Sequence, residues 1–93
     1  MATLKRKFHP HSQVVDTKLD GGEVVLLHLE SKNYFSLNIT GGRIWRGVKE
    51  GLNLQEISQC LQSEFDVDAE QADASVLELI NELSEHKLVQ MLD

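Results

Sequence analysis

The chain has 93 residues, of which 41% are hydrophobic, so it can build one domain with a modest core but not two domains. Residues 1–50 contain eight Lys/Arg and five Asp/Glu, whereas residues 51–93 contain one and ten, and the net charge is −6. The acidic C-terminal half would repel a nucleic-acid backbone. No apolar run reaches the roughly 18–20 residues of a membrane span. One cysteine and no apolar N-terminal signal segment favour a cytoplasmic protein.

Residues 1–12, MATLKRKFHPHS, are polar and basic and contain the only proline. We expect a flexible, loosely attached arm here, followed by a single domain over residues 13–93. His9 and His11 could bind a metal only weakly, because no cysteine or carboxylate cluster accompanies them and a structural site normally supplies four ligands. The sequence therefore predicts no metal site.

Residues 13–37 have the pattern of three short strands. Residues 13–19 form the first, the β-branched and apolar run 24–29 is typical of a central strand, and residues 34–37 form the third. Between them lie two polar turns, the first of which contains the glycines that a tight hairpin favours. The pattern predicts a three-stranded antiparallel meander.

Residues 40–92 are mostly helical in pattern. The first helix is expected over residues 40–50 with Gly51 just past its end. The second begins at Asn53 and the third at Asp68, each with Glu or Gln three residues later, as in a capping box. Residues 88–92 either continue the third helix or pack as an extended end. Apolar residues recur at helical spacing in all three helices: Ile44, Trp45, Val48; Leu54, Ile57, Leu61, Phe65; Ala69, Ala72, Val76, Leu79, Ile80, Leu83.

Strands that precede helices along the chain predict an α+β domain. Three short helices separated by tight turns resemble a helix-turn-helix core. We therefore expect a winged helix-turn-helix-like fold, with an N-terminal three-stranded antiparallel sheet followed by three α-helices.

No group of residues predicts catalysis. His28 lies in an apolar strand, where packing is its expected role, and Cys60 lies beside an apolar stripe as a small packed residue. Gly41-Gly42 lacks the further glycines and the lysine of a phosphate-binding loop. Because a nucleophile, a base and a pocket do not occur together, we expect no enzyme, no catalytic residue and no cofactor.

Aromatic residues gather near the junction between the last strand and the first helix. Tyr34 and Phe35 are neighbours in a strand and must point to opposite faces, so one is expected in the core and the other exposed or covering a helix. Trp45 fits core packing, with an interface anchor as the alternative. Either Asn38 or Thr40 can cap the first helix.

The window 34–45, YFSLNITGGRIW, resembles the signature of the PqqD-like family, whose members recognise the leaders of ribosomally made, post-translationally modified peptides (RiPPs). The family pattern is filled here by Tyr34-Phe35, Leu37-Asn38, Thr40-Gly41 and Ile44-Trp45. Residues 20–31, 54–65 and 76–83 are similar to the hairpin and the second and third helices of the family. This chain has Lys32-Asn33 where the family often has Gly-Arg, and Lys87 where it often has glycine.

The resemblance implies a non-catalytic module that captures the leader of a precursor peptide and presents it to a modifying enzyme, such as a radical-SAM protein, a protease or a cyclase. In the family, the leader adds as a strand beside the third strand, in the groove between that strand and helix three. With Val76 at the centre of the buried stripe, the helical angles place Asp73, Leu77 and Asn81 on one flank of helix three. Leu77 would then form the floor of the peptide groove; the alternative is that it only extends the core. The peptide-binding residues so implied are Asn33, Tyr34, Phe35, Ser36, Leu37, Asp73, Leu77 and Asn81.

A winged-helix DNA-binding regulator is the alternative function. The third helix, residues 68–86, contains no Lys or Arg and six Asp/Glu, which disfavours contact with a duplex. We therefore expect neither a nucleic-acid nor a membrane partner. The same acidic helix predicts a leader with Lys or Arg where it passes. Monomer and homodimer are both compatible with the sequence.

Overall fold

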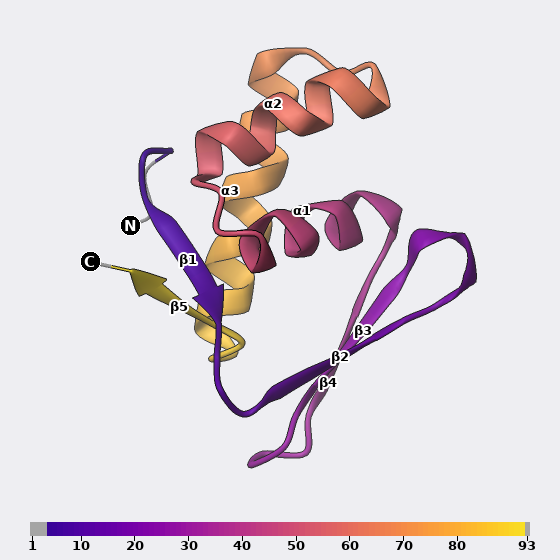
Figure 1. Cartoon of the computed structure of the whole chain (residues 1–93), viewed down its shortest axis with the longest axis vertical. Helices are drawn as coiled ribbons and strands as arrows, with labels where there is room; N and C mark the ends of the chain where they lie inside the picture. The colour runs from indigo at the N-terminus through magenta and orange to yellow at the C-terminus, as the bar shows by residue number, and fades with distance from the viewer. Residues whose placement is uncertain (1–3, 93) are drawn as a thin grey trace.

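The computed structural model describes residues 4–92 (Figure 1). The three-stranded antiparallel sheet and the three helices confirm the predicted α+β, winged helix-turn-helix-like fold. Helix α1 lies between this sheet and α2 (Figure 1). The elements in chain order are β1 (Lys7–Pro10), β2 (Val14–Lys18), the 3₁₀ turn η1 (Asp20–Gly22), β3 (Val24–His28), β4 (Tyr34–Leu37), α1 (Ile39–Lys49), α2 (Leu54–Phe65), α3 (Ala69–Glu85) and β5 (Val89–Leu92).

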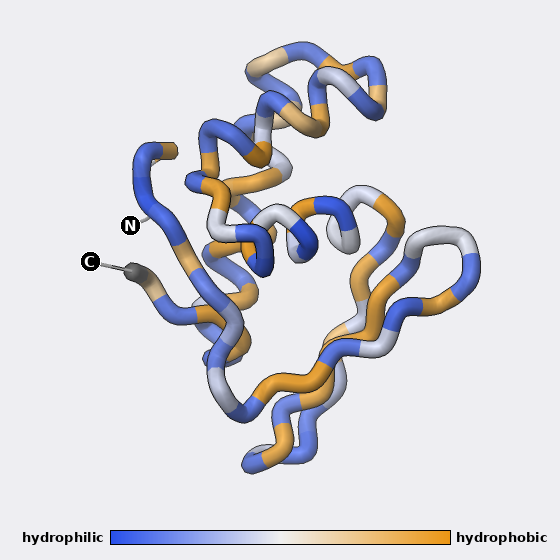
Figure 2. The backbone as a smooth tube through the Cα atoms, viewed as in Figure 1, coloured by the Kyte–Doolittle hydropathy of each residue, from blue (hydrophilic) through white to orange (hydrophobic). Residues whose placement is uncertain are grey.

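The sheet has the order β2-β3-β4, with β3 in the centre as predicted. On β3, Val24, Leu26 and His28 are buried and face the helices, while the two residues between them are only partly buried. Apolar residues on both faces give β3 its continuous hydrophobic run (Figure 2). The hairpin comes very close to α1, because a Cβ atom added to Gly42 would lie 2.6 Å from the carbonyl oxygen of Gly22. Glycine at position 42 therefore allows the two backbones to approach this closely.

All three helix starts have the side-chain caps that the sequence suggests. Asn38, not Thr40, caps α1, since its Oδ1 accepts a hydrogen bond of 2.8 Å from the backbone N–H of Gly41. Asn53 and Glu56 form a complete capping box on α2. Asp68 caps α3 in the same way as Asn38 caps α1. Sequence spacing was sufficient here because these contacts join residues only three positions apart.

Two helix ends have the same backbone geometry but different residues. After α1, Gly51 has φ 82°, and the N–H groups of Gly51 and Leu52 donate to carbonyls of the last helical turn. After α3, Lys87 has φ 58°, and the N–H groups of Lys87 and Leu88 bond in the same way. Both ends are Schellman motifs, in which the left-handed position favours glycine. The lysine that replaces the family glycine therefore ends α3 in the usual geometry rather than prolonging the helix.

The expectation of a flexible arm is wrong for residues 7–10. Strand β1 pairs with β5 in antiparallel register from Lys7↔Leu92 to Pro10↔Val89, so the first and last strands lie side by side (Figure 1). Phe8 is only 5% exposed and belongs to the core. The partner strand lies some eighty positions later, so no local pattern could reveal the pairing. Residues 1–3, which the arm prediction also covered, lie outside the described residues.

The same pairing decides between the two alternatives for the C-terminal segment, which packs as an extended strand.

Trp45 is 3% exposed and is part of the core, as the packing interpretation predicts. His28 is 7% exposed, and its ring lies 5.1 Å from that of His11, so its role is packing as expected. Cys60 is half-buried.

Candidate functional site

One edge of β4 is open. The N–H of His28 donates to the carbonyl of Asn33 at 3.0 Å, and the register pairs Leu26 with Phe35. Because backbone groups alternate between the two sides of a strand, the amides of Tyr34 and Ser36 point away from β3. Among residues 4–92, no other strand pairs with that edge. An extended chain can therefore add there.

The two aromatic residues of β4 divide as predicted. Phe35 turns inward and is packed against the core, while Tyr34 is 74% exposed. The ring of Phe35 lies 5.4 Å from the ring of His86, at the C-terminal end of α3. Phe35 and His86 thus connect the open strand to the third helix.

Two hollows follow each other along α3, and together we call them the α3 groove. The first, of about 350 Å³, lies between the start of β4 and the end of α3. The second, of about 310 Å³, lies between the start of α1 and the middle of α3. The groove is lined in the first hollow by His28, Asn33, Tyr34, Phe35, His86 and Leu88, and in the second by Asn38, Thr40, Gly41, Ile44, Ser75, Glu78, Leu79 and Glu82.

The structure brings together only part of the sequence-predicted site. Residues 33–35 line the groove, Ser36 lies on the open edge and Leu37 is buried beneath it. Asp73 instead accepts a hydrogen bond from Ser58 of α2, and Leu77 is packed against the core on the same flank. Asn81 is exposed one turn further along that flank.

The flank of α3 that lines the groove is the opposite one, with Ser75, Glu78, Leu79 and Glu82. The helical angle from Val76 shows how far a residue lies from the centre of the buried stripe, but it does not show which of the two flanks faces β4. The sequence signal that could have identified this flank is the pair Leu79 and His86, an apolar and an aromatic residue on the other side of the stripe. The binding role of every residue in the predicted set stays a prediction.

The α3 groove is acidic at one end and aromatic at the other. Glu78 and Glu82 line the second hollow, and no Lys or Arg lines either hollow. Within residues 4–92, no group of three His, Cys, Asp or Glu side chains is placed to hold a metal ion. In the same range, no helix combines the length and hydrophobicity needed to cross a bilayer.

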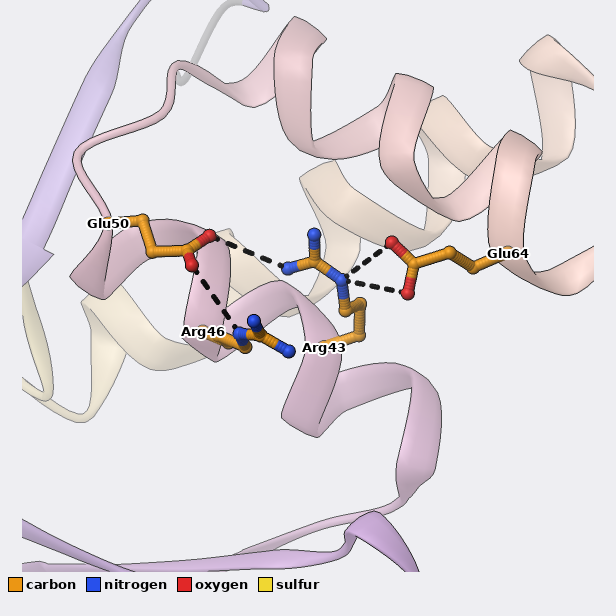
Figure 3. A network of polar contacts seen from close by, with 4 residues as sticks. All are labelled: Arg43, Arg46, Glu50 and Glu64. Atoms are coloured by element: carbon orange, nitrogen blue, oxygen red, sulfur yellow. Dashed lines mark hydrogen bonds and ion pairs between the residues drawn. The ribbon is translucent and has the colours of Figure 1, made fainter.

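A separate polar network lies on the other side of α1. The Nε of Arg43 donates to both carboxylate oxygens of Glu64 at 3.1 and 3.0 Å, so it ties α1 to α2 (Figure 3). Glu50 lies between Arg43 and Arg46, with N–O distances of 3.9 and 3.4 Å. Sequence reasoning did not find this network, because its partners come from two helices with no shared spacing.

Asp16 anchors β2 to α1 beside that network. Its Oδ2 accepts a hydrogen bond of 2.7 Å from Nε1 of Trp45 and lies 2.8 Å from Nζ of Lys49. Burial alone would raise the pKa of the Asp16 carboxyl, but the hydrogen bonds from Lys49 and Trp45 and the charge of Lys49 outweigh it, so the pKa lies below its ordinary value.

In this small winged-helix-like fold, the open edge of β4 lies beside a groove that is acidic at one end, which is the geometry of proteins that can accept an extended peptide by strand addition. The family model described as Coenzyme PQQ synthesis protein D (PqqD) matches residues 23–89, and the chain belongs to this family.

Two solved structures are similar to this chain. One is described as TbiB1 in complex with the TbiA(beta) leader peptide, with 32% identity over 88% of this chain and 94% of that chain and a TM-score of 0.83. The other is described as lasso peptide synthetase B1 complexed with the leader peptide, with 26% identity over 90% and 98% and a TM-score of 0.82. A search of curated proteins gave no match.

Proposed function

We propose that this chain binds the leader of a RiPP precursor peptide as an added strand on β4 and presents it to the enzyme that modifies the precursor. The observation that carries this proposal is the open edge of β4 beside the α3 groove. The family membership and the two similar structures, both described as leader-peptide complexes, support it. The DNA-binding alternative has no support, because α3 is acidic and lacks Lys and Arg.

Backbone groups supply the affinity in this mode and side chains supply the choice of peptide. The amides and carbonyls of Tyr34 and Ser36 pair with the guest strand. An apolar or aromatic leader side chain enters the hollow at Phe35 and His86. A Lys or Arg of the leader lies near Glu78 and Glu82, at the acidic end.

The partner enzyme follows from the same role. A protein that holds a precursor by its leader leaves the remainder of the precursor free for chemistry elsewhere. We infer that a radical-SAM protein, a protease or a cyclase performs that chemistry and that this chain contributes binding. The similarity to a lasso peptide synthetase B1 supports a partner from peptide maturation.

The open edge is tested by removing one amide. Ser36→Pro deletes an N–H that does not pair with β3, so the sheet is expected to form while the guest strand loses a hydrogen bond. Fluorescence polarisation with a labelled synthetic leader peptide that the parent chain binds should show about tenfold weaker binding. Ser36→Ala, which keeps the N–H, should bind as the parent does. Equal affinity of the proline variant, with native circular dichroism, would remove the proposed edge.

The acidic end is tested by a matched pair on α3. Glu82 lines the groove, whereas Glu85 is exposed on the far face of the helix. Glu82→Gln should weaken the binding of the leader and reduce the salt dependence of that binding, while Glu85→Gln should do neither. Equal effects of the two variants would show that only the overall charge matters.

A further inference from the structure

A third hollow, separate from the two that make up the α3 groove, lies on the other side of α1, and we call it the α1 hollow. It has a volume of about 650 Å³ and is bordered by the β2–β3 hairpin, α1 and the end of α2. That volume is in the range of sites that take a small ligand or a cluster of side chains. It shares no lining residue with the α3 groove.

The α1 hollow has an apolar floor. Val24 and Trp45 are buried at its base, Phe65 is half-buried, and Ile39 is 51% exposed although it begins a helix next to the core. Most of the surface exposed inside the hollow is apolar. Such a floor favours an apolar side chain over a fully solvated ion.

Four of the nine Lys/Arg of the chain line the α1 hollow, namely Lys18, Arg43, Arg46 and Lys49. The carboxylates that accompany them are Asp16, Glu50 and Glu64. The hollow is therefore slightly positive within a chain whose net charge is −6, while the α3 groove is negative. An acidic partner would be repelled by most of the molecule but not here.

The arginines of the hollow have fewer acceptors than donors. Arg43 and Arg46 share the single carboxylate of Glu50, at 3.9 and 3.4 Å, distances too long for strong hydrogen bonds (Figure 3). Nη1 of Arg43 is the one buried side-chain nitrogen or oxygen of the described residues without a hydrogen-bond partner. Buried donors normally have an acceptor, so this network has room for a further carboxylate oxygen that would accept hydrogen bonds from the arginines.

We propose that the α1 hollow binds an acidic segment of the modifying enzyme, in which an aromatic or large aliphatic side chain is flanked by Asp or Glu. This inference rests on the proposed function for the identity of the partner. The apolar side chain of the segment covers Ile39 and Phe65, and the flanking carboxylates form ion pairs with Arg46 and Lys18. Glu50, released by Arg46, can then move onto the unpaired Nη1 of Arg43. The incoming carboxylates thus complete a network that is incomplete in the free chain.

The lining also argues against a phosphate ligand. A phosphate would leave the apolar floor at Ile39 and Phe65 uncovered and would find no polar partner there. Carboxylates with an apolar neighbour match both parts of the hollow, because guanidinium groups pair with them in planar geometry.

The test uses the full chain and a synthetic probe, an amidated and acetylated heptapeptide with one central phenylalanine and three aspartates on each side. Amide chemical shifts should change at residues 39–49 and near Phe65. The double variant with Lys18→Gln and Arg46→Gln should raise the probe Kd about tenfold. The control with Lys5→Gln and Arg6→Gln removes the same charge from exposed positions outside the hollow and should leave the Kd unchanged.

Two further probes separate the contributions of charge and apolar contact. Replacing the central phenylalanine by serine should weaken binding at least fivefold, and replacing the aspartates by asparagines should abolish it. No probe binding, shifts confined to the α3 groove or equal loss in both double variants would overturn the inference. Leader binding to the same variants reports on the proposed function separately, because Lys18 and Arg46 do not line the α3 groove.

Discussion

At the scale of single residues, Lys87 is the clearest place where the chain is less stable than it could be. It occupies the left-handed position of a Schellman motif with φ 58°, which costs a side-chain-bearing residue roughly 1–2 kcal/mol. Lys87→Gly removes that cost but adds flexibility to the unfolded chain, so we expect the free energy of unfolding to rise by about 0.5–1 kcal/mol. Urea denaturation followed by circular dichroism measures this.

A control shows whether the geometry is responsible. Glu82→Gly places glycine at a helical position of α3 and should lower the free energy of unfolding by about 1 kcal/mol. If Lys87→Gly were also destabilising, the lysine side chain would be contributing contacts that the left-handed backbone does not suggest. Lys32, with φ 64°, is the other position where the family often has glycine, and the same argument applies there.

Asp16 makes stability depend on pH in the acid range. Its pKa in the folded chain is lower than its ordinary value of 3.8, so the native state binds fewer protons than the unfolded state. The stabilisation is fully present above the unfolded pKa and is lost as pH falls through the folded pKa. Asp16→Asn should lower the free energy of unfolding by about 1 kcal/mol at pH 7.

The pH series provides the check on that assignment. The difference between the parent and Asp16→Asn should stay constant from pH 7 down to the unfolded pKa and shrink as pH falls below it, because the parent carboxyl then becomes neutral as well. Urea denaturation at each pH gives the two free energies. A difference that stays constant below that pKa as well would mean that Asp16 acts through its hydrogen bond to Trp45 rather than through its charge.

At the scale of elements, the sequence predicts what is local. The caps of all three helices join residues three apart, and the three strands of the meander follow one another with short turns. The β1–β5 pair has neither a short sequence separation nor a connecting turn that could be recognised. A single phenylalanine among polar and basic neighbours has no period, and its partner strand lies at the other end of the chain.

The role of β1 can be measured through Phe8. Its side chain is buried under the two-stranded sheet, so Phe8→Ala should lower the free energy of unfolding by about 3–4 kcal/mol. Lys7→Ala, at an exposed neighbouring position, should change it by less than about 0.5 kcal/mol. Urea denaturation of both variants decides whether the segment is structural. Near-parent stability of Phe8→Ala would restore the interpretation of a loosely attached arm.

At the scale of the whole molecule, the sequence predicted the fold and the open strand but not which side of α3 faces it. The buried stripe of α3 is fixed by Val76, Ile80 and Leu83, and the flanks on its two sides are equivalent until the position of α2 is known. The hydrogen bond from Ser58 to Asp73 commits one flank to α2 and leaves the other to the groove. Only the tertiary arrangement contains that information.

The same arrangement puts the two proposed binding regions on opposite sides of α1. The α3 groove and the α1 hollow share no lining residue, and α1 between them is fixed by the Asn38 cap and by core contacts of Ile44 and Val48. Neither ligand needs the helix to move, so each should bind with the other present. We expect the leader Kd to change by less than about twofold when the acidic heptapeptide saturates the chain, since a coupling free energy needs a state that both ligands bias.

Isothermal titration of the leader into the chain, with and without the heptapeptide, measures this coupling, and the reverse titration must give the same factor. Independent binding would allow the chain to hold a precursor on one side and an acidic partner segment on the other at the same time. A tenfold loss of leader affinity would mean that the two ligands compete for the α3 groove or that α1 changes position. Chemical shifts at Phe35 and Phe65 distinguish these outcomes, because competition moves only the first and a displaced helix moves both.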